Sequence, residues 1–174
     1  VLHHGGILDK YIGDAIMAVF GAPLVVPRDA DNAVAASIEM VRALERFNQQ
    51  RASCGLEPIE VGIGISTGEV VAGSVGTTKR MDYTVIGESV NLAARLEGAN
   101  KHYGTSVLVS DATISQMKSA RSWREIDIRR VTGTNKLVSV FEPLDCYPEA
   151  VRGNLNRARG AYQKGIRLYR QRQW

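Results

Sequence analysis

Cysteine, histidine, proline and aromatic residues are all scarce in this 174-residue sequence, which contains 2 Cys, 3 His, 5 Pro and 6% aromatic residues. The two cysteines, Cys54 and Cys146, are too few for a disulfide-stabilised scaffold, and their spacing is not that of a metal site. His3 and His4 are adjacent, with no nearby cysteine, so a zinc site is not expected there. These absences argue against a disulfide-rich or zinc-dependent fold.

A long hydrophobic run is also lacking. The longest apolar stretch, Ala15 to Val26, is too short to cross a bilayer and contains both Gly and Pro. No secretory signal is visible at the start of the given sequence, and the composition agrees with a cytoplasmic domain. The chain is long enough for one domain with a substantial core.

The formal charge of +4 is concentrated near the C-terminus. Residues 152–174 contain seven Lys or Arg and no Asp or Glu, so the preceding residues carry a net charge of −3. Apolar residues recur in this tail at near-helical spacing: Leu155, Ala158, Tyr162, Ile166 and Tyr169. We therefore predict a main domain, residues 1–145, and a basic amphipathic helix within residues 146–174. The simpler expectation is that this helix packs on its own domain or continues into a further segment, with no nucleic-acid partner. Binding to nucleic acid or to a membrane surface is the alternative that its basic amphipathic pattern leaves open.

The segment KYIGDAIMAVFG, residues 10–21, predicts a β-hairpin. Two apolar stretches flank Gly13 and Asp14, and this pair suits a tight turn because glycine tolerates positive φ and aspartate bonds its own backbone. Asp14 is therefore expected at the turn with its carboxylate outward, and Lys10 on the incoming strand. By local pattern alone, an ordinary surface turn with a solvated lysine remains the simpler explanation.

The segment MDYTVIGESVNLAAR, residues 81–95, predicts a strand that leads into a helix. Gly87 separates the two elements, and Glu88 suits the positive end of the helix dipole. Asn91 and Arg95 are four positions apart, so they share one helical face and can reach one ligand. An amide beside a planar, permanently charged guanidinium suits a ribose and a phosphate. The alternative is an exposed helix face that binds nothing.

Together, these two segments resemble the catalytic core of the class III nucleotidyl cyclases, which make cyclic AMP or cyclic GMP. The resemblance implies an α+β fold in which helices cover a ferredoxin-like antiparallel sheet. It also implies roles for five residues: Lys10 and Thr84 read the adenine of ATP, Asp14 binds metal, Asn91 orients the ribose, and Arg95 stabilises charge on the α-phosphate. Two Mg²⁺ or Mn²⁺ ions would complete each site.

The residues at the two base-reading positions indicate adenine rather than guanine. Adenine presents an acceptor ring nitrogen beside a donor amine, which the ammonium of Lys10 and the hydroxyl of Thr84 match. Guanylate-making relatives usually carry Glu and Cys at these places, so GTP is the less favoured substrate. The threonine form also resembles a subgroup of soluble, bicarbonate-responsive cyclases, which makes bicarbonate a candidate regulator.

The sequence departs from the family pattern at the metal site and at a phosphate-binding lysine. The family's first metal-binding aspartate lies on a strand upstream of the lysine hairpin, and we expect that strand and the following helix to precede Val1. Asp9 is not expected to replace it, because adjacent residues of a regular strand point to opposite faces. Residues 1–174 alone are therefore expected to be weakly active or inactive. Within Val131 to Leu144, Lys136 is a candidate triphosphate contact, although a solvated side chain explains it more simply.

Glycines recur in VGIGISTGEVVAGSVG, residues 61–76, which resembles the central strand pair of the family. A P-loop would need a glycine directly before its lysine, whereas Thr78 precedes Lys79. Glycine within a strand usually marks a bulge or a close approach of another backbone. These glycines are therefore predicted to serve sheet packing and not phosphate binding.

Members of the family work as head-to-tail dimers with each site built across the interface. Because one sequence here carries both the base-reading residues and a metal aspartate, we expect a homodimer with two equivalent sites. A regulatory domain is expected upstream or downstream in the parent protein. The main alternative to an active adenylate cyclase is a catalytically incomplete homology module that binds nucleotide or dimerises.

Overall fold

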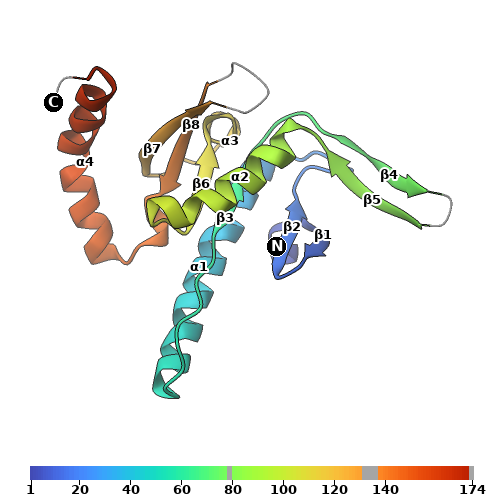
Figure 1. The fold of residues 1–174 in the computed structure, drawn as a ribbon, viewed down its shortest axis with the longest axis horizontal. Helices are drawn as coiled ribbons and strands as arrows, with labels where there is room; N and C mark the ends of the chain where they lie inside the picture. Colours follow the sequence, from blue (N-terminus) through green and yellow to red (C-terminus); the bar gives the residue numbers. More distant parts are fainter. Residues whose placement is uncertain (78–79, 131–136, 173–174) are drawn as a thin grey trace.

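The computed structural model describes residues 1–77, 80–130 and 137–172 of the chain. It has the predicted α+β architecture, with one four-stranded sheet and two separate two-stranded ribbons (Figure 1). The strands are β1 (Ile7–Ile12), β2 (Ala15–Val19), β3 (Ile63–Ile65), β4 (Val71–Thr77), β5 (Arg80–Ile86), β6 (Val107–Ser110), β7 (Trp123–Arg130) and β8 (Leu137–Pro143). The helices are α1 (Asp29–Ser53), α2 (Glu88–Tyr103), α3 (Asp111–Gln116) and α4 (Glu149–Arg170), with short 3₁₀ helices η1 (Leu2–His4) and η2 (Leu144–Cys146).

The four-stranded sheet has the strand order β3-β6-β8-β7. The β6–β8 and β8–β7 pairs are antiparallel, as predicted, whereas β3 and β6 are parallel. Parallel neighbours need a long crossover connection. Here the crossover consists of the β4–β5 ribbon and α2, so the ribbon and the helix are inserted between two adjacent strands of the sheet.

Strand β6 is the centre of the core. All of its residues are buried, and alternate side chains of a strand point to opposite faces. Val107 and Val109 pack with Val34 and Ile38 of α1, whereas Leu108 packs with Leu96 of α2. The two helices therefore cover opposite faces of the same sheet.

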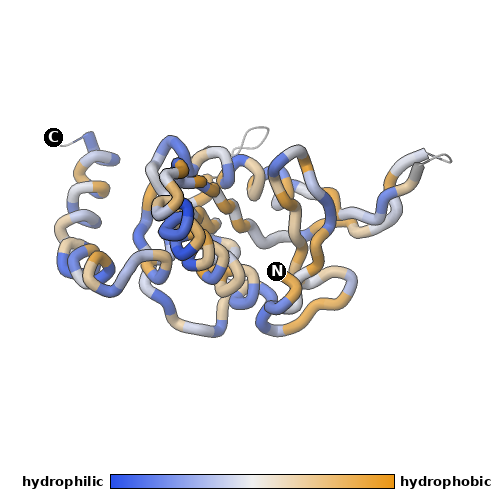
Figure 2. The backbone as a smooth tube through the Cα atoms, turned by 90° about the horizontal axis from the view of Figure 1, so that it is seen from below, coloured by the Kyte–Doolittle hydropathy of each residue, from blue (hydrophilic) through white to orange (hydrophobic). Residues whose placement is uncertain are grey.

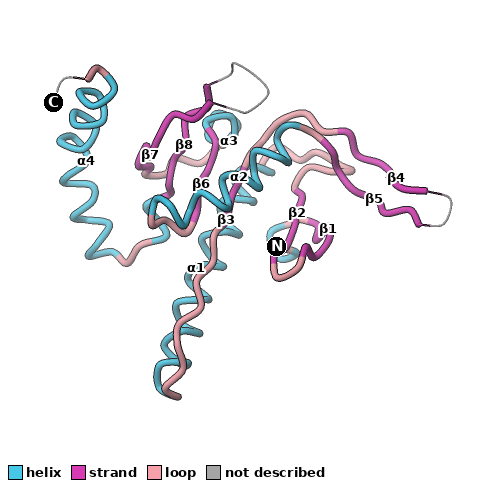
Figure 3. The backbone as a smooth tube through the Cα atoms, in the orientation of Figure 1, coloured by secondary structure: helices cyan, strands magenta, loops and turns pink. Residues whose placement is uncertain are grey.

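The chain returns from the end of α1 to β3 along the helix itself, as Figure 3 shows. The Asn48 side chain fixes this loop to α1, because its amide donates to the Ile59 carbonyl and its carbonyl accepts from the Ile59 N–H, both at 2.8 Å. The loop brings the chain to β3, which lies directly against α2.

Helix α2 approaches β3 so closely that only glycine fits at Gly64. A Cβ atom on Gly64 would lie 2.0 Å from the Ala93 carbonyl oxygen and 2.4 Å from the Glu97 nitrogen, both in the backbone of α2. At Gly62, a Cβ would lie 2.9 Å from the Glu97 carbonyl oxygen. The prediction that glycines of this segment serve packing is confirmed at these two positions. A Cβ atom added to Gly73, in β4, would have no atom within 4 Å apart from those of Gly73 itself and its chain neighbours.

The predicted basic C-terminal helix forms as α4 and contacts β7, one of the two edge strands of the four-stranded sheet as described. Arg170 forms an ion pair with Glu125 at 2.9 Å, and the Arg124 guanidinium lies 5.8 Å from the centre of the Tyr162 ring. Figure 2 shows hydrophilic and hydrophobic residues alternating along the turns of α4. None of the helices within the described ranges is long and apolar enough to cross a membrane.

We predict that Gly64→Ala lowers the free energy of unfolding by about 2 kcal/mol or more, because the added methyl group would force β3 and α2 apart. Urea denaturation of the purified protein measures this change. Gly73→Ala is the matched control, since its methyl group enters open space. Equal losses of stability in the two variants would contradict the packing explanation.

Candidate active site

The β1–β2 hairpin carries Lys10 on its first strand and Asp14 in its turn. Gly13 has a φ of 64°, in the left-handed region that favours glycine, and the following Asp14 is exposed. This confirms the predicted hairpin and the position of Asp14 at its turn. Through η1, the hairpin is also anchored to α1, where the His4 imidazole hydrogen-bonds the carboxylate of Glu39.

Strand β1 contains a bulge at Asp9. Leu8 pairs with Ala18 and Lys10 pairs with Met17, so Asp9 is an extra residue without a partner in the β2 register. A bulge re-aims the side chains around it. The expectation that Asp9 and Lys10 point to opposite faces is therefore wrong, since regular alternation is interrupted between them.

The re-aimed Asp9 carboxylate lies between the two predicted base-reading residues. Thr84 of β5 donates its hydroxyl hydrogen to Oδ2 of Asp9 at 2.9 Å, and Nζ of Lys10 lies 3.4 Å from the same oxygen. The Asp9 side chain is only 7% exposed, whereas that of Lys10 is 36% exposed. Lys10 and Thr84, which are far apart in the sequence, thus meet at one carboxylate oxygen.

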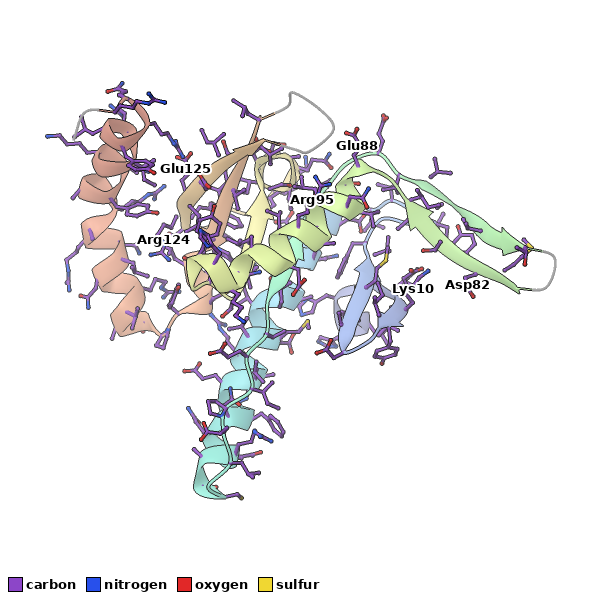
Figure 4. All side chains as sticks on the ribbon, in the orientation of Figure 1. Lys10, Asp82, Glu88, Arg95, Arg124 and Glu125 are labelled. Carbon is purple, nitrogen blue, oxygen red and sulfur yellow. The ribbon has the colours of Figure 1, made fainter. Side chains whose placement is uncertain are left out.

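Helix α2 presents Asn91 and Arg95 on its exposed side. Leu96 and Ala99 are buried on its other side, and Leu92 packs beside them. Within the described part of the chain, the Asn91 and Arg95 side chains have no hydrogen-bond or ion-pair partner, so the positive charge of Arg95 is not neutralised there. Figure 4 shows Arg95 on α2 and Lys10 on the neighbouring hairpin.

The predicted metal site is represented by one residue. Asp14 offers the oxygen ligand that Mg²⁺ and Mn²⁺ prefer. Residues 1–77, 80–130 and 137–172 contain no group of three His, Cys, Asp or Glu side chains that could hold a metal ion. Asp14 therefore offers one ligand toward a divalent ion, and other donors would complete its coordination. Lys136, the candidate triphosphate contact, lies outside the described residues.

Asp9 is the residue of this site that the sequence patterns did not reveal. The sequence of β1, ILDKYI, places two charged residues side by side in an otherwise apolar strand. Regular alternation would put one of these charges on each face, so this local pattern does not indicate the bulge. The partner Thr84 cannot be inferred from it either, because the contact depends on how the two ribbons meet.

A comparison with known protein families matches residues 8–141 to the adenylate and guanylate cyclase catalytic domain. An adenylate cyclase of Anabaena cylindrica is 43% identical over 145 residues, which are 79% of this chain and 28% of that protein. Adenylate cyclase 1 of Rhizobium meliloti is 37% identical over 142 residues, which are 82% of this chain and 21% of that protein. The chain thus spans about a quarter of the length of these relatives.

Solved structures of two related proteins share the fold. The adenylyl cyclase CyaB from P. aeruginosa is 35% identical, with a TM-score of 0.72, over 82% of this chain and 73% of that chain. The guanylyl cyclase Cya2 is 38% identical with a TM-score of 0.70, over 82% of this chain and 72% of that chain. The fold class predicted from the sequence is thereby confirmed. One of these proteins is an adenylyl cyclase and the other a guanylyl cyclase, so structural similarity agrees equally with ATP and with GTP as the substrate.

Proposed function

Because this chain belongs to the family of adenylate and guanylate cyclase catalytic domains, we propose that its parent protein is an adenylate cyclase. The reaction is the conversion of ATP into 3′,5′-cyclic AMP and pyrophosphate, a phosphorus–oxygen lyase reaction. In it, the ribose 3′-hydroxyl attacks the α-phosphate and pyrophosphate leaves. The observation that carries the choice of ATP is the meeting of Lys10 and Thr84 at Asp9.

The proposed adenine contacts follow from the chemistry of the two side chains. Lys10 donates to the acceptor ring nitrogen, and Thr84 accepts from the neighbouring amine. Guanine carries a ring N–H and a carbonyl oxygen at the corresponding places, so both contacts would be mismatched. A site with hydrogen-bonding groups that match one base rejects the other because buried polar groups would be left unpaired.

Asn91 and Arg95 are proposed to hold the reacting part of the substrate. Asn91 orients the ribose, and Arg95 neutralises the negative charge that builds on the α-phosphate during attack. Arg95 suits this role because its guanidinium is exposed on the same helical face and can bind phosphate oxygens with two parallel hydrogen bonds. A group that contacts charge formed only in the transition state acts mainly on kcat.

Asp14 is proposed to hold part of a pair of Mg²⁺ or Mn²⁺ ions in each site. Such ions, when bound, lower the pKa of the attacking hydroxyl and neutralise the triphosphate. We expect the second carboxylate upstream of Val1. An aspartate on an apolar strand in that segment supports catalysis, whereas its absence favours the alternative of a nucleotide-binding or dimerising homology module.

The proposed assembly is a homodimer with a site at each end of a shared interface. The β4–β5 ribbon supports it, because a two-stranded ribbon needs packing partners for stability and this one exposes large apolar side chains. These side chains are Val71, Val75, Met81, Tyr83 and Ile86. A regulatory domain in the parent protein and a response to bicarbonate remain proposals for the whole molecule.

We predict that Arg95→Ala lowers kcat for cyclic AMP formation by roughly 10²-fold or more, with a smaller change in KM, because the lost charge acts mainly in the transition state. Steady-state kinetics of the full-length protein tests this. Arg46→Ala, which removes an exposed arginine from α1, is the matched control and should leave kcat unchanged. Near-normal turnover of the Arg95 variant would remove this residue from the mechanism.

We predict that the full-length protein makes cyclic AMP from ATP in preference to cyclic GMP from GTP, with either Mg²⁺ or Mn²⁺. Product assays with both nucleotides and both metals measure this preference. Residues 1–174 alone should give little product, since they contain one recognised metal carboxylate. Binding of ATP without any product from the full-length protein would favour the homology module.

We also predict a dimer for the complete catalytic domain in solution. Static light scattering gives its molar mass directly. Replacement of two exposed apolar residues of the ribbon, Met81→Ser and Tyr83→Ser, should shift the mass toward that of a monomer. A strict monomer before substitution would contradict the shared-site arrangement.

A further inference from the structure

We propose that Asp9 is a specificity-determining positioning residue, which fixes the direction of the Thr84 hydroxyl hydrogen and thereby selects adenine over guanine. This inference rests on the adenylate cyclase function proposed above. Asp9 contacts neither metal nor phosphate in that proposal. Its effect on the substrate passes through Thr84 and Lys10.

The bulge in β1 supplies the geometry. As the extra residue of the hairpin, Asp9 is free of the regular register, and its carboxylate reaches across to β5. The Asp9 side chain is 7% exposed and Thr84 is 9% exposed, so bulk water competes little for their hydrogen bond. The 2.9 Å separation of Oγ1 and Oδ2 is a normal hydrogen-bond distance.

The direction of this hydrogen bond is fixed by the chemistry of the two groups. An ionised carboxylate can only accept, whereas a hydroxyl has one hydrogen to donate and two lone pairs that accept. Thr84 therefore gives its only hydrogen to Asp9. What remains for a ligand is acceptor capacity, which matches the amine of adenine and opposes the carbonyl oxygen of guanine.

A threonine without such a partner would not discriminate in this way. Its hydroxyl could rotate, accept from the amine of adenine in one orientation and donate to the carbonyl of guanine in the other. The contact with Asp9 thus makes Thr84 selective for adenine. A threonine at position 84 is not sufficient for this selectivity without the carboxylate beside it.

Asp9 also orients Lys10, the hydrogen-bond donor of the two proposed base-reading residues. The Lys10 ammonium lies 3.4 Å from the same Oδ2 atom and carries three hydrogens, so one can face Asp9 while another faces the ring nitrogen of adenine. One buried carboxylate therefore prepares a donor and an acceptor side by side, in the order that adenine requires.

The test compares kcat/KM for ATP and GTP in the full-length protein and in four variants: Asp9→Ala, Asp9→Asn, Thr84→Val and the double variant Asp9→Ala/Thr84→Val. Asp9→Ala should reduce the ATP-to-GTP ratio roughly tenfold, the amount that one hydrogen bond can contribute. Asp9→Asn should keep most of the preference, because its amide oxygen still accepts from Thr84. In the Thr84→Val background, Asp9→Ala should change the ratio clearly less than it does in the wild-type protein, since the part of the effect that passes through the hydroxyl is already lost and only the contact with Lys10 remains.

Two results would overturn the inference. One is an equal change in kcat/KM for ATP and GTP on Asp9→Ala, which would indicate a general structural role. The other is an undiminished change in the ratio in the Thr84→Val background. If Asp9→Ala does not fold, as thermal denaturation will reveal, Asp9→Leu provides a side chain of similar length without an acceptor and is subject to the same criteria.

Binding measurements separate this inference from the proposed function. Dissociation constants for non-cyclisable analogues of ATP and GTP are determined with the same variants. Loss of ATP preference on Asp9→Ala in these measurements supports the inference even if the wild-type protein forms no cyclic nucleotide, a result that would refute the cyclase proposal alone. Equal affinity of the wild-type protein for both analogues would overturn the inference.

Discussion

The close contact between α2 and β3 is the constraint on which the rest of the site depends. Gly64 allows the backbone of the helix to lie directly on the strand, and β3 is held in turn by the buried strand β6. Once α2 is fixed in this position, Leu96 and Ala99 fill the core and Asn91 and Arg95 necessarily face outward. The packing of small residues thus determines where Asn91 and Arg95, the side chains proposed to hold the ribose and the α-phosphate, are presented.

Lys10 and Thr84, the residues proposed to read the base, are placed by a different kind of contact. They lie on two ribbons that are not hydrogen-bonded to the four-stranded sheet within the described residues. A hydrogen bond between Asp9 and Thr84 links these ribbons at the site, with Lys10 beside it. A buried charged hydrogen bond is costly to leave unsatisfied, so it can fix the relative position of two otherwise separate ribbons.

Local patterns in the sequence were sufficient for the elements of the site. The Gly13-Asp14 turn, the strand before Gly87 and the helical face shared by Asn91 and Arg95 all depend on neighbours within a few positions, and the structure confirms them. The expected alternation of Asp9 and Lys10 failed because a bulge breaks the two-residue period, and a single extra residue reverses which face each later side chain occupies. The packing role of the glycines was predicted, but only the structure distinguishes Gly64 from Gly73.

The sequence by itself therefore determined the family resemblance, the hairpin, the helix and the residue types that suit a purine nucleotide. Only the tertiary structure decided that Thr84 and Lys10 share one carboxylate, because that contact joins segments far apart along the chain. Propensity and periodicity act over a few residues, whereas the partner of a buried polar side chain depends on how whole elements pack. For this reason the turn that carries Asp14 could be predicted from its own residues, but the contact between Asp9 and Thr84 could not.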